Sequence, residues 1–553
     1  MTLNLTEISK NRLLGMLTFV IIMLGFYFRL DQFFIQTLID DEWHAVHQLL
    51  RSTPNKIFNS FGHADYSIPL TLFYWFEAHY FGLSELTMRM PALLFGLATM
   101  LFFTLFVYKH FSKYEAVLFG FLLSMSTVLT IYSHKARPYA ITVFLVYFAI
   151  WAFYQYYNKS DKKILYAVLY CGTAALAVWL HIVVAFFVSA PFFLEFIRVF
   201  VKYKKQKLRK ILTLTYLGIA TLLVTSILIL PPLLNDIASL ANKSGKNTPS
   251  LQTLLGALYL MFSTKSTVIV IICSALAVIG LPRVFAKSVI CINIAIGFVL
   301  TVLVIIIIQP AWIQHSATFL RYLLPIIPLF LIAITAGFYT LFELIEQRFS
   351  QNMAFYIKLV SLAMFVGLYV FNSPMFGLIK SPNSNINHSK YIFDFRDDKN
   401  KIRQHLLKRP VSNFWSTLSK SPLKFKIAVA PWYFESYNWD SPIWEGISKQ
   451  LVLPGYLDGL CVNNRAGEVP NNQRFRFKNV AYLADPIDIA SRNIYYIVYQ
   501  KTSRFNFKNL YKNLDSCTDE LINIYGKPFF EDELIMVFKP NLPRVVGDKV
   551  DKQ

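Results

Sequence analysis

The sequence predicts an α-helical polytopic membrane protein with about eleven transmembrane helices and a C-terminal mixed α/β soluble domain. Hydrophobic residues make up 55% of the 553 residues, and charged residues make up only 16%. A soluble domain usually contains about 25% charged residues. Long apolar runs fill residues 12–373, whereas no run after Lys380 is long enough to cross a bilayer. These observations exclude a disordered, collagen-like or coiled-coil chain and an ordinary soluble enzyme.

Apolar runs close to the ~20 residues that a helix needs to cross a bilayer define the predicted spans. No small-residue cleavage site follows the first run, so we expect it to be an uncleaved anchor. The polar segment Ser381–Ser389 has the composition of a linker, so we divide the chain into residues 1–380 and 381–553. The predicted spans are residues 12–30, 88–108, 115–132, 137–157, 164–180, 182–199, 211–231, 267–285, 288–308, 322–342 and 356–373.

Basic residues predict the orientation of the spans. The formal net charge of +22 would suggest a nucleic-acid partner in a soluble protein, but membrane proteins gather Lys and Arg in their cytoplasmic loops. We therefore predict no nucleic-acid partner. With Lys10 and Arg12 in the cytoplasm, alternation places seven Lys and Arg residues of segment 198–210 in one cytoplasmic loop. The loop 31–87 and the C-terminal domain then lie on the exported side.

The C-terminal domain shows the pattern of a mixed α/β fold. Residues 426–430, 493–499 and 533–538 are rich in β-branched and aromatic types and predict strands, and residues 510–525 include a predicted helix. No glycine-rich phosphate loop is present, which argues against a nucleotide-sugar donor bound in this domain. Four aromatic residues suit either sugar stacking or a core or membrane-surface role: Trp432, Tyr433, Trp439 and Trp444.

The five cysteines fall into two groups. Cys171, Cys273 and Cys291 lie in apolar spans, where cysteine behaves as a small hydrophobic residue. Cys461 and Cys517 lie in the exported domain, where the compartment permits a disulfide bond. The sequence does not show whether these two side chains lie close together, so the disulfide bond is an open alternative.

Three adjacent acidic residues, Asp40, Asp41 and Glu42, follow the first span. Like charges and partial desolvation raise the pKa of a carboxylate such as Asp41, which suits a general base or a cation site. The alternative is a solvated acidic loop end that helps to set the membrane topology.

Cationic residues occur on the same predicted side of the membrane, against the positive-inside bias. Lys135 and Arg137 follow the third span, His181 separates the fifth from the sixth, and Arg321 lies at the start of the tenth. Together they suit a membrane-bound phosphate, which Arg can bind through two parallel hydrogen bonds. Individually, each Arg could instead extend to lipid headgroups, and His181 could be only a turn residue.

The ordered set of these motifs resembles the GT-C glycosyltransferases, in particular the bacterial family 39 type. That group is related to protein O-mannosyltransferases and to the aminoarabinose transferase of lipid A. The resemblance covers about residues 1–345, and no single motif carries it alone. The matching segments are Asp41-Glu42, Pro69-Leu70 followed by residues 81–91 (FGLSELTMRMP), residues 133–139 (SHKARPY), residues 321–325 (RYLLP), and His181 at a hairpin between two spans.

The resemblance implies a polyprenyl phosphate carrying one sugar as the donor, used on the periplasmic side of a bacterial inner membrane. It implies that Asp41 deprotonates the acceptor hydroxyl, while Glu42 orients the acceptor or Asp41 and Asp40 shares this work. The configuration at the sugar would be inverted. Arg137 and Arg321, supported by Lys135 and His181, would stabilise the leaving phosphate. The residues expected to bind acceptor or sugar are His63, Asp65 and Tyr139.

Two departures from the family pattern affect these expectations. Lys135 stands where the family often has an acidic residue, which puts a metal bridging two carboxylates in doubt. A divalent metal is therefore an open alternative, and no cofactor is assigned. The second departure is Ser67-Ile68-Pro69, which replaces a His-Pro-Pro sequence of the family.

Two other function classes are weighed against the glycosyltransferase. A polytopic transporter or lipid flippase would place ionisable residues deep within spans, and Glu195 is the nearest case. A membrane-anchored structural or sensory protein would leave the acidic cluster and the opposing cations unexplained. The sequence does not identify the sugar. A lipid A molecule, another glycolipid, a glycan chain or a protein hydroxyl all remain as acceptors.

Overall fold

The computed structural model describes most of the chain. Its described residues are 7–31, 33, 42–64, 66–158, 161–202, 207–245, 247–375, 411–430, 444, 448–456, 481–501 and 514–540. The chain divides into two compact units. We call the first, made of 1–31, 53–73 and 89–378, the helical unit. The second, made of 32–52, 74–88 and 379–553, is called the sheet unit.

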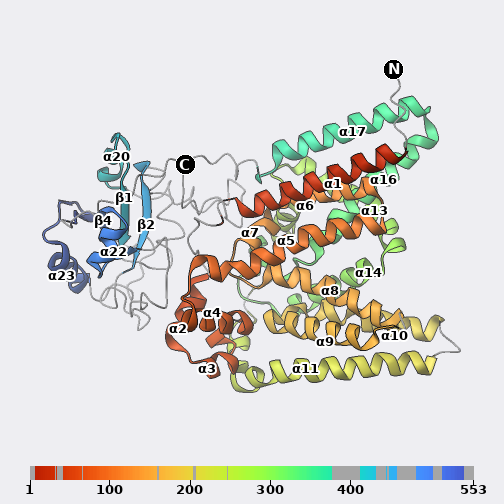
Figure 1. Ribbon diagram of the computed structural model, residues 1–553, viewed down its shortest axis with the longest axis horizontal. Helices are drawn as coiled ribbons and strands as arrows, with labels where there is room; N and C mark the ends of the chain where they lie inside the picture. The colour runs from red at the N-terminus through yellow and green to blue at the C-terminus, as the bar shows by residue number, and fades with distance from the viewer. Residues whose placement is uncertain are drawn as a thin grey trace. The chain divides into compact units, whose positions relative to one another are not determined.

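The long helices confirm a multi-pass membrane protein. Within the described residues, ten helices are long and apolar enough to span a bilayer, or eleven if one bent pair counts as a span. Figure 1 shows the long helices of the helical unit running alongside one another. They are α1 (Glu7–Leu30), α5 (Glu85–His110), α8 (Tyr139–Asn158), α9 (Lys163–Leu180), α10 (Ala185–Lys202), α11 (Lys207–Ala241), α13 (Thr267–Lys287), α14 (Val289–Ile308), α16 (Ile326–Arg348) and α17 (Gln351–Asn372).

The span predicted at 115–132 is not one straight helix. It consists of α6 (Lys113–Ser124) and α7 (Thr127–Ser133), which bend by 61°. The bend occurs because Ser126 adopts an extended conformation, with φ −68° and ψ 98°. A new helix start leaves backbone N–H groups without helical partners. Thr127 N–H finds one outside its own helix, donating to Ser263 Oγ at 2.9 Å.

The span predicted at 322–342 starts later than expected, at Ile326. Arg321 and Tyr322 instead end the short helix α15 (Ser316–Tyr322). Pro325 explains the shift because proline favours a helix start and disfavours helical backbone at the residue before it. Arg321 therefore lies on a separate short helix before the span.

Shorter helices connect the spans. Residues of the predicted loop 31–87 form, among others, the helix α4 (Ile68–Tyr80). The other short elements are α2 (Glu42–Arg51), α3 (Pro54–Phe58), the 3₁₀ turns η1 (Gly62–Ala64) and η2 (Ile182–Val184), and α12 (Leu251–Met261).

Helices α13 and α16 pack with their backbones in contact. A Cβ at Gly280 would lie 1.9 Å from the carbonyl oxygen of Ala333, and one at Gly337 would lie 2.0 Å from that of Leu276. Only glycine permits so close an approach, which is a common device for packing helices in membranes. The span cysteines Cys171, Cys273 and Cys291 are buried and free, as expected for small apolar residues.

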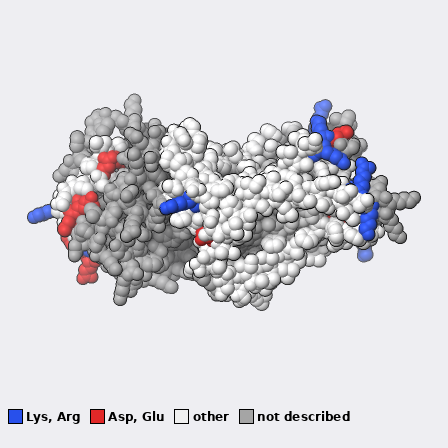
Figure 2. All heavy atoms as spheres, turned by 90° about the horizontal axis from the view of Figure 1, so that it is seen from below, with Lys and Arg blue, Asp and Glu red and all other residues white. Residues whose placement is uncertain are grey.

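Charged residues at the ends of three helices meet in one cluster of the helical unit. Arg283, near the end of α13, contacts Glu115 at the start of α6 at 3.3 Å and Glu343 of α16 at 2.8 Å. Lys287 lies 4.0 Å from Glu115. Alternation assigns all four of these residues to the cytoplasmic side. Figure 2 shows Lys and Arg side chains gathered at one end of the helical unit, beside a long face with few charges.

Reporter fusions test which end is cytoplasmic. A fusion after Lys205 is expected to read as cytoplasmic, because its loop contains the seven-residue basic cluster. A fusion after Lys390 is expected to read as exported. The control is a fusion after Lys109, which should match the one after Lys205. If Lys205 and Lys390 report the same side, the number of spans between them is wrong by an odd number.

The sheet unit contains a six-stranded mixed sheet of order β3-β2-β1-β4-β6-β5. The first four strands of this order pair in parallel, and β6 joins β4 and β5 in antiparallel fashion. The strands and helix expected at 426–430, 493–499, 533–538 and 510–525 are present, shifted by a few residues. The strands are β1 (Lys426–Ala430), β2 (Leu451–Tyr456), β3 (Ala481–Tyr482), β4 (Ile494–Gln500), β5 (Phe530–Glu531) and β6 (Ile535–Phe538).

Helices cover both faces of this sheet (Figure 1). The helix α20 (Asn413–Ser419) packs on one face, while α22 (Pro486–Ser491) and α23 (Leu514–Tyr525) pack on the other. Trp444 belongs to the core, since its ring stacks on Trp415 of α20 at 5.1 Å. Trp432, Tyr433, Trp439, Cys461 and the side chain of Cys517 lie outside the described residues, so the disulfide is untested.

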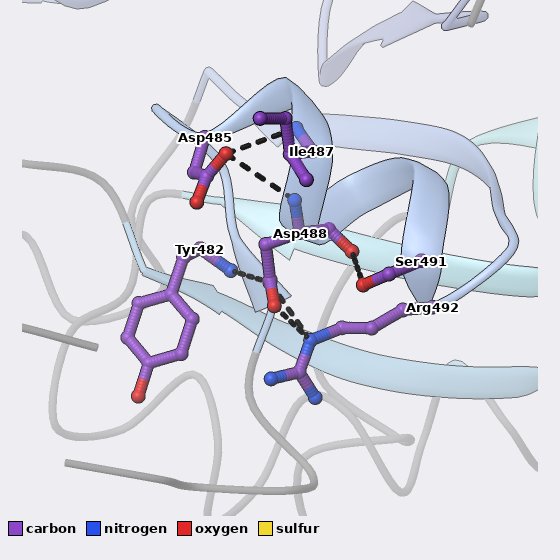
Figure 3. Close-up of polar contacts among 6 residues, drawn as sticks. All are labelled: Tyr482, Asp485, Ile487, Asp488, Ser491 and Arg492. Atoms are coloured by element: carbon purple, nitrogen blue, oxygen red, sulfur yellow. Dashed lines mark hydrogen bonds and ion pairs between the residues drawn. The ribbon is translucent and has the colours of Figure 1, made fainter. Parts of the chain in front are cut away.

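Two carboxylates organise the connection from β3 to β4 (Figure 3). Asp485 caps α22 by accepting hydrogen bonds from the backbone N–H groups of Ile487 at 2.9 Å and Asp488 at 3.3 Å. Asp488 accepts from Tyr482 N–H of β3 at 2.9 Å and from Arg492 Nε at 2.7 Å. These bonds hold the crossover helix against the strand that precedes it.

Candidate functional site

The loop between α7 and α8 is charged yet buried. His134 and Lys135 are almost fully enclosed, and only 9% of Arg137 is exposed. Burying the cations Lys135 and Arg137 in this way is costly unless partners compensate, so this pattern is concentrated at functional sites. The loop makes a tight turn, in which Arg137 N–H donates a hydrogen bond to Lys135 O at 2.7 Å. Pro138 then begins the turn that leads into α8.

Three predicted site residues meet at one end of the helical unit. Tyr139 begins α8, His181 ends α9, and Arg321 lies on α15. The ring of His181 is 5.5 Å from that of Tyr139 and 5.5 Å from that of Tyr322. The guanidinium carbon of Arg321 lies 5.6 Å from the ring centre of Tyr139 and 5.8 Å from that of Tyr322. Two tyrosine rings therefore lie against one histidine and one arginine.

His181 is neutral at physiological pH. Burial, and then the charge of Arg321, lower the pKa of His181 to about 3. A neutral imidazole can donate one hydrogen bond and accept another, but it adds no positive charge. The fixed charge in this group of rings therefore belongs to Arg321. The contact with Arg321 is visible only in the folded protein, because 140 residues separate the two positions in the sequence.

Two further buried cations act on the loop and were not among the predicted site residues. Burial, followed by the charges of Arg89 and Arg29, lowers the pKa of His134 to about 3. Arg29 also donates to the carbonyl oxygens of Gly25 at 3.0 Å and Leu123 at 3.4 Å. Their positions in the sequence could have identified them, because each is an arginine at a predicted exported end of a span, against the positive-inside bias, as Arg137 is.

The predicted carboxylates are only partly described. Asp40, Asp41 and Asp65 lie outside the described residues. Glu42 begins α2 in the sheet unit and is fully buried. Within the described ranges, no group of three His, Cys, Asp or Glu side chains forms a candidate metal site. The divalent metal therefore remains an untested alternative.

His63 lies on a segment that is attached to the end of α11. Asp236 interrupts the helical conformation of α11, with φ −145° and ψ 38°. Its carboxylate accepts hydrogen bonds from Ser60 Oγ at 2.5 Å, from Gly62 N–H at 2.9 Å and from Ser239 Oγ at 2.6 Å. His63 N–H in turn donates to Ser60 Oγ at 3.1 Å. Asp236 thus positions the turn that carries the exposed His63.

Asp236→Ala is expected to loosen this turn. The change removes two bonds from Asp236 to the 54–64 segment, and a hydrogen bond to a charged group contributes about 1.5–3 kcal/mol. At the low end this corresponds to roughly tenfold faster hydrogen exchange of that segment. Hydrogen exchange measured by mass spectrometry on the full chain checks the result. Ser239→Ala is the matched control because Ser239 shares the carboxylate but lies on α11 itself; equal effects of the two variants would contradict the assignment.

Comparison with known proteins identifies similar structures but no similar sequences. A scan against protein-family models finds no match, and a search of curated proteins finds no relative. ArnT from Cupriavidus metallidurans in the apo state is 11% identical, with a TM-score of 0.46 over 96% of this chain and 98% of that one. The same protein bound to undecaprenyl phosphate has a TM-score of 0.44 at 11% identity, with the same coverage.

The apo oligosaccharyltransferase of Archaeoglobus fulgidus is also similar. It is 11% identical, with a TM-score of 0.46 over 88% of this chain and 69% of that one. ArnT and this oligosaccharyltransferase are members of the GT-C fold, the class that the sequence motifs resemble. Since these identities are low and the TM-scores lie below 0.5, the function proposed for this chain depends on its own residues.

Proposed function

We propose that this protein is a membrane glycosyltransferase that moves a sugar from a polyprenyl-phosphate donor to a hydroxyl acceptor. The acceptor is a glycolipid, a glycan or a protein. The single observation that carries the proposal is the convergence of Tyr139, His181 and Arg321 from three separate segments, next in sequence to the buried Lys135 and Arg137. A binding site for the phosphate of a lipid donor needs this combination of fixed positive charge and apolar surroundings.

The leaving group explains why the cations matter. When the acceptor oxygen attacks the anomeric carbon, the bond from that carbon to the phosphate oxygen breaks. The electron pair of the broken bond stays on the phosphate, whose negative charge increases. Arg321 supplies fixed positive charge for it, with Arg137 and Lys135 assigned the same role. Neutral His181 orients the phosphate through a hydrogen bond and does not contribute charge.

The acceptor side of the reaction is assigned from the sequence. Asp41 takes the proton of the acceptor hydroxyl as its oxygen attacks, and attack opposite the phosphate inverts the configuration. Glu42 orients the acceptor or Asp41, and Asp40 assists. His63, Asp65 and Tyr139 are assigned to acceptor or sugar binding. We place the reaction at the periplasmic face of a bacterial inner membrane, with the domain 381–553 on that side and the catalytic domain at 1–380.

The buried acid Glu195 does not favour a transporter. Its carboxylate accepts hydrogen bonds from Tyr154 at 3.0 Å and Arg198 at 2.7 Å, and Tyr154 accepts one from Asn293 at 2.9 Å. These bonds connect α8, α10 and α14 near the end of α10, where Arg198 is partly exposed. The network is accounted for as a structural contact between three helices.

The proposal is tested by sugar transfer with purified protein. The assay supplies a defined polyprenyl-phosphate sugar and follows release of the polyprenyl phosphate together with formation of the glycosylated acceptor. Asp41→Asn serves as the inactive control, and Arg348→Ala is the control for a cation at the opposite, cytoplasmic end. Release of polyprenyl phosphate at the same rate by wild-type and Asp41→Asn protein would refute the proposal.

A further inference from the structure

At the end of α12, a serine occupies a position whose backbone geometry favours glycine. Ser263 N–H donates to Leu260 O at 3.1 Å, and the next N–H, that of Thr264, donates to Tyr259 O at 3.2 Å. This pair of bonds is the Schellman motif, in which the left-handed residue is usually glycine. Ser263 is that residue here, with a φ of 51°, and it is fully buried. Since a side chain strains this conformation, the presence of serine needs an explanation.

The hydroxyl of Ser263 supplies the explanation. Its Oγ accepts a hydrogen bond from Thr127 N–H at 2.9 Å. Thr127 begins α7 after the break at Ser126, so no carbonyl of its own helix is placed to accept from this N–H. Thr127 is only 1% exposed, and a buried backbone N–H without a partner is costly. The strain at Ser263 is therefore offset by a bond that α7 needs.

The turn that carries Ser263 is itself held in place. The hydroxyl of Tyr369 donates to Phe262 O at 2.9 Å, and Lys265 N–H donates to Asn372 O at 3.0 Å. Both partners belong to α17. The residues on either side of Ser263 are thus fixed to a long helix, and α7 begins at a hydroxyl whose position is set independently of α7.

The other end of α12 is connected to α15. Thr253, in the first turn of α12, donates from Oγ1 to Gln314 O at 2.6 Å. Gln314 lies two residues before α15, the helix that carries Arg321, and α12 packs against α15. The 11 residues of α12 extend over roughly 16 Å. One helix therefore bonds to the chain before α15 with one end and to α7 with the other.

Both connected segments lead to the candidate site. All seven residues of α7 are buried, and the loop with Lys135 and Arg137 follows directly. Tyr132 of α7 places its ring 4.8 Å from that of Tyr139, which in turn contacts Arg321. Because packed interiors transmit displacements, a shift of α7 or of α15 changes how these cations lie relative to each other.

We propose that α12 is a spacer helix that fixes the loop 134–138 and Arg321 relative to each other. Ser263 and Thr253 are its positioning residues: the first acts through α7 and the second through Gln314. The spacer follows from the packing of the helical unit alone, whereas its effect on binding of the donor phosphate rests on the proposed function. Neither hydroxyl takes part in the chemical step.

Hydrogen exchange of the full chain in detergent tests Ser263 without any substrate. Ser263→Gly is expected to speed exchange of the peptide 127–138 about tenfold, because Thr127 N–H loses its acceptor. The same change should leave the peptide 256–264 unchanged or slow its exchange, because glycine relieves the strain of the turn. Faster exchange of both peptides would mean that Ser263 only stabilises its own turn, and no change in 127–138 would also overturn the proposal.

Thr335→Val is the matched control for Ser263→Gly. Thr335 is another buried hydroxyl of the helical unit, but it donates within its own helix, to Leu331 O at 2.9 Å. Its replacement should change the exchange of neither peptide. An effect on 127–138 as large as that of Ser263→Gly would show that loss of any buried hydroxyl loosens α7, which would contradict the specific role of Ser263.

The other end of α12 is tested with Thr253 and Ser250, which cap the helix together. Thr253 N–H donates to Ser250 Oγ at 3.2 Å, and Ser250 N–H donates to Thr253 Oγ1 at 3.1 Å. Ser250→Ala weakens this cap alone, whereas Thr253→Val also releases Gln314 O. We expect Thr253→Val to speed exchange of the peptide 312–322 roughly fivefold and Ser250→Ala to leave it unchanged. Equal effects would overturn the role of Thr253.

Turnover tests whether the two ends act as one spacer. Ser263→Gly and Thr253→Val are each expected to lower kcat about tenfold and to leave the KM of the acceptor unchanged, because misplaced groups stabilise the leaving phosphate less well. The double variant should be no slower than either single variant, since a spacer that has lost one end fixes no distance. Independent effects of residues this far apart would instead add. Additive losses, or a normal kcat in both single variants, would overturn the positioning role.

The two kinds of measurement separate this proposal from the glycosyltransferase proposal. The expected exchange pattern without any sugar transfer by the wild type would refute the glycosyltransferase and keep the spacer helix. Sugar transfer by the wild type, with normal exchange in Ser263→Gly and Thr253→Val, would refute the spacer helix and keep the glycosyltransferase. Ser250→Ala should transfer sugar at the rate of the wild type in either case.

Discussion

Asp41→Asn is expected to lower turnover at least ~100-fold, the usual contribution of acid–base catalysis. The amide keeps the shape of the carboxylate but cannot accept the proton of the acceptor hydroxyl. We expect Asp41 to be ionised near neutral pH, since a general base must be able to accept a proton. Donor binding and expression should change little.

The initial rate at saturating lipid donor is the measurement, with Asp40→Asn as the matched control. Asp40 is adjacent and has the same chemistry, and its replacement should have the milder effect. If Asp40→Asn abolishes turnover while Asp41→Asn is nearly normal, the motif is misaligned by one residue. Normal rates in both variants would show that neither Asp41 nor Asp40 is the general base, which would contradict the proposed mechanism.

Arg321→Ala is expected to lower turnover by roughly 100-fold, comparable with losing one preorganised donor to a developing oxyanion. Donor binding should also weaken. Burial, the larger cause of the low pKa of His181, persists in the variant, so we expect His181 to stay neutral and not to replace the missing charge. Arg321→Lys should recover only part of the activity, because lysine keeps the charge but lacks the planar fork that binds two phosphate oxygens.

Binding of the polyprenyl-phosphate donor and its turnover are measured separately for Arg321→Ala, Arg321→Lys and Arg348→Ala. Arg348 ends α16 and is exposed, and its replacement should affect neither quantity. Full activity of Arg321→Ala would remove Arg321 from the site. Full recovery by lysine would mean that charge alone suffices.

The spans were predictable from the sequence because each is a local property. Twenty consecutive apolar residues must form a helix in a bilayer, whatever the rest of the chain does. The two differences also have local causes. Ser126 breaks the span predicted at 115–132, and Pro325 delays the one predicted at 322–342. Strand β2 was missed because its sequence, LVLPGY, contains Pro and Gly, which lower the strand signal.

The site was predictable only as a set of residue types on one side of the membrane. Charge against the positive-inside bias identified Lys135, Arg137 and Arg321, and a break in an apolar run identified His181. The same signal exists for Arg29 and Arg89, which are fully buried.

The sequence by itself determined the class of the protein and the positions of most of its spans, because apolar length acts locally. Only the tertiary structure decided which exported residues meet. His181 and Arg321 become neighbours because separate helices pack together, and burial, followed by the charge of Arg321, lowers the pKa of His181 and leaves it neutral. Likewise, the parallel strands β1 and β4, far apart in sequence, become neighbours only in the folded sheet. Contacts of this kind depend on packing between distant segments, which no local pattern records.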